Sequence, residues 1–138
     1  MVNLNLAMGH AASEAIGYLE QEPATQKSSV LLEKLAAIYY TQGKLSDTFQ
    51  ANSKALQLPM APLQRARVLL AQAQLLATFV KEEQAFDLYQ QFQKEFPDYP
   101  DPLSIYQKML PLARSLKKTA EVERIQKEVE RLSPPAEK

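Results

Sequence analysis

The chain of 138 residues contains no cysteine and no tryptophan, three glycines and a single histidine. The lack of cysteine excludes disulfide bonds and thiolate metal sites, although it does not identify a cellular compartment. The 16 basic and 16 acidic residues cancel to a formal net charge of zero. A nucleic-acid-binding protein normally has a basic excess, because phosphate neutralisation dominates its affinity. We therefore expect no nucleic-acid partner.

Long apolar runs are also lacking. No stretch approaches the ~18 consecutive apolar residues of a membrane span, and the first ten residues, "MVNLNLAMGH", have neither the basic start nor the long apolar segment of a signal peptide. We expect no membrane span. The compartment stays open: the cytoplasm by default, or the bacterial periplasm if the chain is the mature segment of an exported protein.

Catalytic patterns are missing as well. His10 and Glu14 lie one helical turn apart, but this pair matches neither the Glu-x-x-His pairs of di-iron bundles nor the H-E-x-x-H of zinc proteases. His10 is expected at the surface. There is no glycine-rich phosphate loop, and Ser28 and Ser29 precede a predicted helix as N-cap residues. The sequence predicts no catalytic residue, no metal and no cofactor, and thus not an enzyme.

The remaining pattern is helical. With 46% hydrophobic and 23% charged residues, the composition is that of a folded globular protein, and apolar residues recur at helical spacing without any strand-like alternation. Only the tail 133–138 is expected to be disordered. The spacing predicts an all-α protein of seven helices, near 8–21, 28–42, 45–57, 62–79, 83–95, 102–117 and 119–132.

A repeat of 37 residues runs through these helices. Large side chains early in the first helix of each pair are Leu32, Leu69 and Tyr106, each 37 residues after the last. The turn punctuation at Pro23, Pro97 and Pro134 keeps the same register. Further positions in phase are Ala36, Ala73 and Leu110; Tyr39, Leu76 and Ala113; and Tyr18, Ala55, Phe92 and Val129.

These units resemble tetratricopeptide repeats. The middle unit, "RVLLAQAQLLATFVKEEQAFDLYQQFQKEFPDYP", carries the best match, and the one before it, "LLEKLAAIYYTQGKLSDTFQANSKAL", also fits well. The chain departs from the family in its period of 37 rather than ~34. It also departs in Gly43, which has no counterpart glycine in the later units, and in the polar Gln72.

The resemblance implies a right-handed α-solenoid of antiparallel helix pairs, with about three and a half repeats in one domain over 1–132. An orphan helix at 8–21 precedes repeats at about 28–60, 62–97 and 101–134. The proline-rich stretch "KEFPDYPDPLS" (94–104) is then a rigid joint within that domain, with Asp101 and Pro102 starting the next helix. Pro111, inside the helix that follows, predicts a kink or a break.

The function that this fold implies is a scaffold or adaptor that binds a peptide or protein segment. In such a solenoid the first helix of each pair lines the concave side, which gives a candidate groove at Glu33, Tyr40, Arg67, Leu70, Gln74, Gln107 and Arg114. Tyr40 and Leu70 have a second interpretation, as core residues between helices. Glu33 and Ala37 stand where carboxylate-clamp members of the family carry basic and amide side chains, so we do not expect that mode of binding.

The two end helices suggest an alternative function. The first helix has no partner from its own repeat, so its free side is a candidate for dimerisation or stacking onto a longer array. The last helix carries a narrow apolar stripe, and two i,i+4 pairs are expected on its solvated faces, Glu123 with Lys127 and Arg124 with Glu128. It is interpreted as a polar cap of the solenoid or as a helix that pairs with another chain. Self-assembly into a homo-oligomer thus stays open beside peptide binding.

Overall fold

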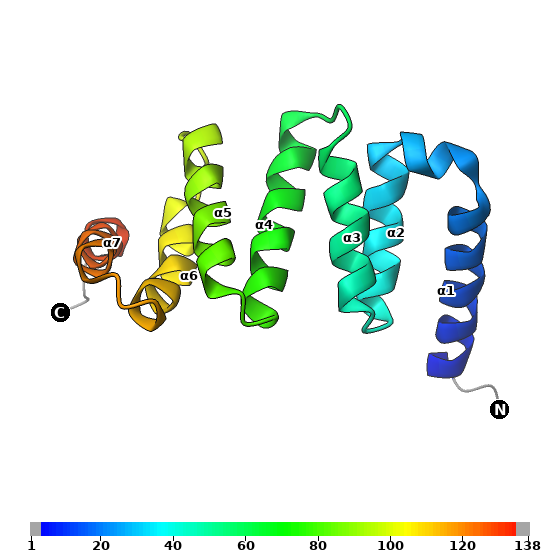
Figure 1. Cartoon of the computed structure of the whole chain (residues 1–138), viewed down its shortest axis with the longest axis horizontal. Coiled ribbons are helices and arrows are strands. Elements are labelled where there is room, and N and C mark those ends of the chain that lie inside the picture. The colour runs from blue at the N-terminus through cyan, green and yellow to red at the C-terminus, as the bar shows by residue number, and fades with distance from the viewer. Residues whose placement is uncertain (1–3, 135–138) are drawn as a thin grey trace. The chain divides into compact units, whose positions relative to one another are not determined.

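The computed structural model describes residues 4–134, with the side chains of residues 4–10 and of Gln26 left out. The all-α class is confirmed: within the described part there are seven α-helices, one short 3-10 helix and no strand (Figure 1). The helices are α1 (Leu4–Gln21), η1 (Pro23–Lys27), α2 (Ser29–Thr41), α3 (Leu45–Leu56), α4 (Pro62–Thr78), α5 (Glu82–Glu95), α6 (Pro102–Ser115) and α7 (Thr119–Leu132).

The helix boundaries agree with the sequence prediction to within a few residues, and two details differ. The first helix begins at Leu4 rather than near residue 8. Pro23, predicted as turn punctuation, opens the 3-10 helix η1, where its missing N–H costs nothing at the first position. The side chain of Asp101 accepts a hydrogen bond from the Ser104 N–H at 3.2 Å, which confirms the predicted start of α6.

The chain divides into two compact units, residues 1–68 and 69–138, with the division inside α4. Unit 1 holds α1, η1, α2, α3 and the first turns of α4, and unit 2 holds the rest of α4 with α5, α6 and α7. The two units are described separately below. A single domain over residues 1–132 stays a prediction.

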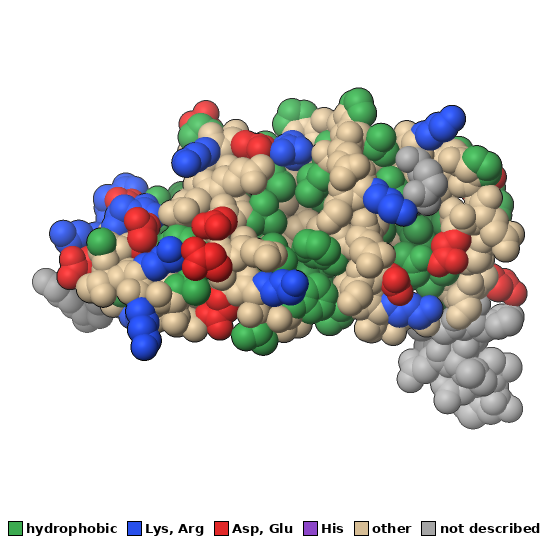
Figure 2. Space-filling model, in the orientation of Figure 1, with side chains coloured by type: hydrophobic (Ala, Val, Ile, Leu, Met, Phe, Trp, Pro, Cys, Tyr) green, Lys and Arg blue, Asp and Glu red, His purple; other side chains and the backbone are tan. Residues whose placement is uncertain are grey.

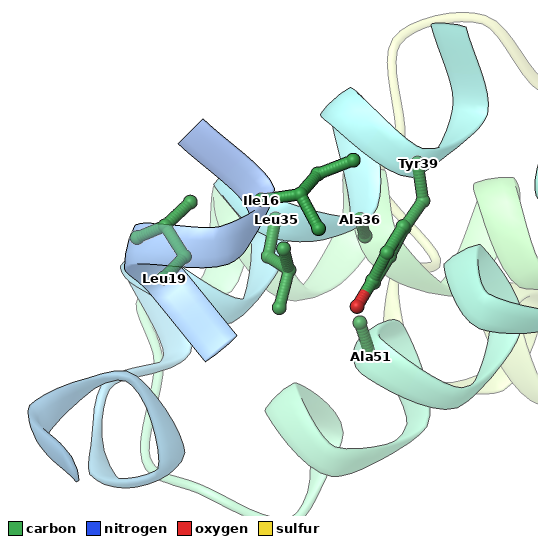
Figure 3. Packing of buried hydrophobic residues seen from close by; sticks show 6 residues of the cluster. All are labelled: Ile16, Leu19, Leu35, Ala36, Tyr39 and Ala51. Carbon is green, nitrogen blue, oxygen red and sulfur yellow. The ribbon is translucent and has the colours of Figure 1, made fainter. Parts of the chain in front are cut away.

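The core of unit 1 joins its first three α-helices. Ile16 and Leu19 of α1 pack with a set from α2 and α3 that comprises Leu35, Ala36, Tyr39 and Ala51 (Figure 3). The small residues Ala36 and Ala51 let the helix backbones approach one another. The Tyr39 hydroxyl also donates a hydrogen bond to the Glu20 carboxylate. The orphan helix is therefore held by apolar burial, worth ~1.5–3 kcal/mol for each large side chain, and by one polar contact.

In unit 2 the buried side chains come from every helix, and the largest are Leu69, Phe86, Tyr89, Phe92, Ile105, Met109 and Ile125. The repeat register holds for Leu69, Ala73 and Ala113, which are all buried. It fails for Tyr106 and Leu110, which are half-buried. In α6 the fully buried positions are Ile105 and Met109 instead, one residue earlier, so that Tyr106 is turned partly to the surface.

The register also fails in α1, where Tyr18 stands in phase with Ala55 and Phe92. Tyr18 is 68% exposed, and its neighbours Ile16 and Leu19 are the buried residues. The phase of α1 is therefore set by its contact with α2 rather than by the repeat.

One backbone geometry recurs in the turns that join α2 to α3, α4 to α5 and α6 to α7. The residues with positive φ in the described chain are Gly43 (72°), Val80 (59°) and Lys117 (59°), spaced 37 apart. In each turn the next backbone N–H reaches back five residues: Lys44 to Tyr39 (2.9 Å), Lys81 to Leu76 (2.9 Å) and Lys118 to Ala113 (3.0 Å). This is the Schellman cap of a helix C-terminus. The position of Gly43 therefore has a structural counterpart in each of the two later repeats, Val80 and Lys117, although neither is a glycine.

The helix that contains Pro111 is continuous from Pro102 to Ser115, so the predicted break into two helices is wrong. Pro111 lacks the N–H that the carbonyl of Gln107 would otherwise accept. Both residues are exposed, so water can hydrate that carbonyl and the helix runs on.

Candidate functional site

An apolar stripe faces solvent along α2. Val30, Ala37 and Tyr40 are all exposed, with Tyr40 62% accessible, and they lie at helical spacing on one side together with Glu33. We call these four residues the α2 face. Because so much of the Tyr40 side chain is exposed, its interpretation as a core residue between helices is wrong. Its ring is available for contact with another molecule.

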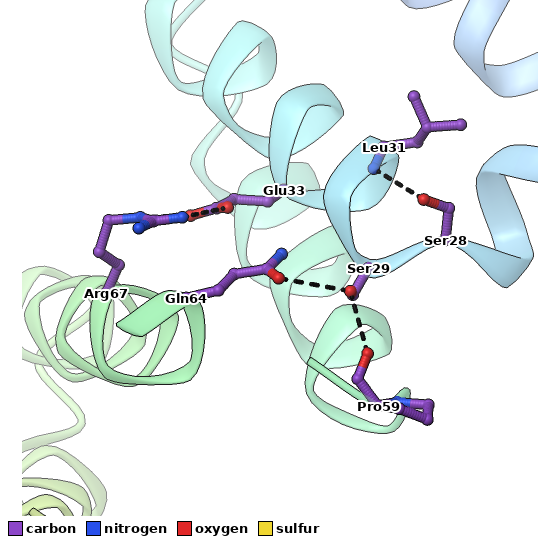
Figure 4. Close-up of polar contacts among 7 residues, drawn as sticks. All are labelled: Ser28, Ser29, Leu31, Glu33, Pro59, Gln64 and Arg67. Atoms are coloured by element: carbon purple, nitrogen blue, oxygen red, sulfur yellow. Dashed lines mark hydrogen bonds and ion pairs between the residues drawn. The ribbon is translucent and has the colours of Figure 1, made fainter. Parts of the chain in front are cut away.

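Arg67 of α4 forms an ion pair with Glu33 on this face. Its Nε lies 3.1 Å from Oε2 of Glu33 and its Nη2 lies 3.0 Å from Oε1, a two-pronged contact within unit 1 (Figure 4). The hydrogen bond from Arg67 to Glu33 raises the pKa of Arg67 further above its usual range. Both residues were predicted as groove positions, but their pairing was not. Since the pair is exposed, water screens it and it holds the helices together only weakly.

A buried polar contact at the start of α2 positions the α2 face. Ser28 caps α2, with its Oγ accepting from the Leu31 N–H at 3.2 Å, as predicted. Ser29 is not a cap, contrary to the prediction. Its hydroxyl is buried, donates to the Pro59 carbonyl at 3.1 Å and lies 3.5 Å from Oε1 of Gln64 (Figure 4). Ser29 thereby ties α2 to the start of α4, which sets Arg67 opposite Glu33.

Leu63 is an exposed apolar residue that the sequence reasoning missed. It lies four residues before Arg67, on the same side of α4. Extending the predicted Arg67 and Leu70 spacing back by one turn would have found it. Its exposure adds a second aliphatic side chain to the surface of unit 1 that carries Arg67.

The other predicted groove residues belong to unit 2. Leu70 of α4 is half-buried, and Gln74 on the next turn is exposed. Gln107 and Arg114 are exposed two turns apart on α6. These positions are surface-accessible and largely polar, in contrast with the aromatic and aliphatic α2 face. The structure brings Glu33 and Arg67 into contact, and a single groove that unites all seven residues stays a prediction.

The two end helices differ in their exposed sides. Tyr18 is the large apolar residue exposed on the described part of α1. On α7, Ile125 is buried, whereas Val122, Val129 and Leu132 are half-buried. This agrees with a narrow apolar stripe on a polar closing helix.

The ion pairs of α7 follow a different spacing from the expected one. The structure pairs Glu121 with Arg124 and Glu128 with Arg131, each at 2.6 Å and three residues apart. The i,i+4 pairs predicted at Glu123 with Lys127 and at Arg124 with Glu128 are not the ones that form. Since Arg124 contacts the carboxylate one turn before it, its guanidinium is already engaged.

Acidic and basic side chains are interspersed over the visible surface (Figure 2). Among residues 4–134 no group of three or more acidic or histidine side chains is arranged to hold a metal ion, and the His10 side chain lies outside the described part. In the same residues no helix combines the length and apolar character needed to cross a bilayer.

Comparison with known proteins gives a fold but no relative in sequence. No family model matches the chain, and no curated protein matches it. Among solved structures it is similar to PilF of Pseudomonas aeruginosa, a tetratricopeptide-repeat protein whose structure accompanies a functional characterisation. The TM-score is 0.64 at 15% identity, over 91% of this chain and 60% of that one. The chain thus spans less than two thirds of that protein's length, and its fold is tetratricopeptide-like.

Proposed function

We propose that this protein is a non-catalytic scaffold that binds a peptide or protein segment along the α2 face and the adjoining side of α4. The observation that carries the proposal is the exposure of Val30, Ala37 and Tyr40 in one stripe beside the Glu33–Arg67 ion pair. Protein interaction is the usual role of tetratricopeptide-like folds, and this stripe offers the mixture of apolar and polar contacts that peptide grooves use.

Tyr40 and Arg67 are the proposed anchors. Tyrosine and arginine dominate interface hot spots, because they bury a large area and still make polar contacts. Arg67 is well suited to this role, since its exposed pair with Glu33 is only weakly held and can exchange for a carboxylate on the ligand. Val30 and Leu63 would contribute apolar area on either side.

Four residues of unit 2 extend the proposal. Leu70 and Gln74 lie on α4, and by the repeat register Gln107 of α6 corresponds to Leu70 and Arg114 of α6 corresponds to Ala77. We propose that these side chains of unit 2 offer polar contacts to a peptide ligand. Their amide and guanidinium groups suit the backbone carbonyls of an extended peptide.

The test begins with peptides selected for binding from a random display library. For a selected peptide, Tyr40→Ala is expected to weaken affinity at least tenfold, about 1.4 kcal/mol, and Arg67→Ala to weaken it as well. Tyr18→Ala is the matched control, because it removes an equally exposed tyrosine from α1. If affinity is the same in wild type, Tyr40→Ala and Arg67→Ala, the α2 face is not the binding site.

Self-assembly through α1 is the second candidate, and the exposure of Tyr18 is what favours it. Under this proposal α1 packs against another copy, so the weight-average mass rises with concentration in sedimentation equilibrium. Tyr18→Ala should then lower association while Tyr40→Ala leaves it unchanged. A strict monomer at high concentration would rule self-assembly out, and it would leave the peptide-binding proposal intact.

A further inference from the structure

A concavity of about 240 Å³ lies in unit 2, where the chain passes from α5 to α6. Its walls are Phe96, Pro97, Tyr99, Pro102 and Tyr106, and Gln93 of α5 also lines it. We call it the aromatic pocket. It is formed by the proline-rich joint that connects two repeats and shares no residue with the α2 face.

The aromatic walls are fixed by packing around Phe92. This side chain is almost fully buried, and its ring centroid lies 5.1 Å from that of Phe96 and 5.0 Å, edge to face, from that of Tyr99. The Tyr99 N–H also donates to the Phe96 carbonyl at 3.1 Å, which closes the turn. Phe96 and Tyr99 themselves remain partly accessible. A ligand would therefore meet surfaces already in place and lose little free energy to ordering them.

The chemistry of the lining is neutral throughout. Aromatic rings and two proline rings provide apolar area, and the hydroxyls of Tyr99 and Tyr106 and the amide of Gln93 provide hydrogen-bond donors. An ionic ligand group would be desolvated there without a charged partner, which is unfavourable. The volume is also below the ~300–1,000 Å³ of sites for drug-sized ligands, so the pocket suits one or two small rings rather than a cofactor.

We propose that the aromatic pocket binds a proline-rich segment of a partner protein in the polyproline II conformation. Such a segment presents apolar rings and backbone carbonyls, with no N–H on its prolines. These are the groups that aromatic walls and donor side chains recognise, and grooves lined by aromatic residues bind proline-rich ligands in this way. The joint between two repeats is then a binding element as well as a spacer.

The test uses a fluorescently labelled decaproline peptide and the full chain. Binding is expected to shift the amide NMR signals of residues around 93–106 and to leave those of α2 unchanged. Tyr106→Ala and Gln93→Ala should each weaken the affinity, Tyr106→Ala at least tenfold. Tyr40→Ala is the matched control, because it removes a tyrosine from the α2 face and should leave decaproline affinity unchanged. Gln93→Ala removes a donor without touching the packing around Phe92, so it keeps the test valid if Tyr106→Ala proves unstable.

Three results would overturn the proposal. One is the absence of shifts around the aromatic pocket at saturating decaproline. Another is weaker decaproline binding in Tyr40→Ala with no change in the pocket variants, which would assign the peptide to the α2 face. The third is tighter binding of a trimethyl-lysine peptide than of decaproline, which would make the pocket a cation site. Each of these leaves the α2 face testable with its own selected peptides.

Discussion

Two turns of the molecule share a backbone conformation but differ in the residue that has a positive φ. One joins α2 to α3 in unit 1, and the other joins α4 to α5 in unit 2. Both end a helix with a Schellman cap, and both close it with a 2.9 Å hydrogen bond that reaches back five residues. In the first turn the left-handed residue is Gly43, and in the second it is Val80. The geometry is thus conserved within the chain, whereas the residue best suited to it is not.

The difference shows what sets the conformation. For an L-residue the left-handed region costs ~1–2 kcal/mol, and a β-branched side chain is the least suited to it. Val80 nevertheless adopts a φ of 59°, with its side chain 75% exposed. Its strain is offset by the packing of the helices on either side, which require a turn of this length and direction. The repeat architecture therefore imposes the turn, and glycine only lowers the conformational strain of forming it.

Gly43→Val should produce the largest change. It places in unit 1 the residue that unit 2 tolerates, and no atom lies within 4 Å of the added Cβ, so the effect is one of backbone conformation. The free energy of unfolding is expected to fall by about 1–2 kcal/mol, measured by urea denaturation. Gly43→Ala is the control and should lower it less, because alanine is not β-branched. An unchanged stability in Gly43→Val would mean that the turn had found another conformation.

Val80→Gly is the converse and should stabilise the protein. Relief of the left-handed strain exceeds the greater flexibility that glycine gives to the unfolded chain, so we expect a gain of about 1 kcal/mol. The side chain is largely exposed, and little apolar burial is lost with it. Thermal unfolding by circular dichroism would measure the gain, and a lower melting temperature would show that the Val80 side chain makes a contact that the cap geometry does not reveal.

The sequence predicts the helices because their signals are local. Ser28 and Asp101 act as N-caps and Gly43 ends a helix, and each does so through its own neighbours. The helices predicted at 62–79 and 83–95 left a turn between them although no residue there favours one, and the 37-residue period agrees with it, since Val80 lies 37 residues after Gly43. A repeat thus carries information that single-residue propensity lacks.

The candidate sites depend on contacts that no periodicity encodes. The exposure of Tyr40 follows from which neighbours reach α2, and its spacing fitted both a core and a surface position. The pairing of Arg67 with Glu33 requires side chains from helices 34 residues apart. The aromatic pocket depends on the phase of α6, where Ile105 is buried and Tyr106 is half-buried. The helical spacing of apolar residues does not predict a shift of this phase by one residue.

The contrast between the units extends to their core tyrosines. Burial raises the pKa of both hydroxyls, that of Tyr89 in unit 2 to about 12, and in unit 1 the hydrogen bond from the Tyr39 hydroxyl to Glu20 raises the pKa of Tyr39 further. Tyr39→Phe should therefore cost about 1 kcal/mol at neutral pH, the value of one hydrogen bond. Tyr89→Phe should have little effect there.

At alkaline pH both tyrosines matter, because both pKa values are raised. A folded pKa above the unfolded value of ~10 means that folding favours the neutral hydroxyl. The stability that this preference adds is complete below pH ~10 and is lost as the pH rises toward 12. Wild type should lose stability across that range, and Tyr89→Phe should lose less of it. Denaturation curves at several pH values would measure both effects, and equal alkaline slopes in wild type and Tyr89→Phe would contradict this account of the Tyr89 environment.

Lys117→Gly should give the smallest effect and sharpen the comparison of turns most. Lys117 occupies the left-handed position between α6 and α7 with the same φ of 59° as Val80, but its side chain is not β-branched. If the strain at these positions is steric and grows with branching at Cβ, the gain from Lys117→Gly is about 0.5 kcal/mol and smaller than that from Val80→Gly. Urea denaturation of both variants and of the double variant would decide this. Equal gains would mean that branching at Cβ adds nothing and that the strain of the left-handed conformation is the same for any side chain.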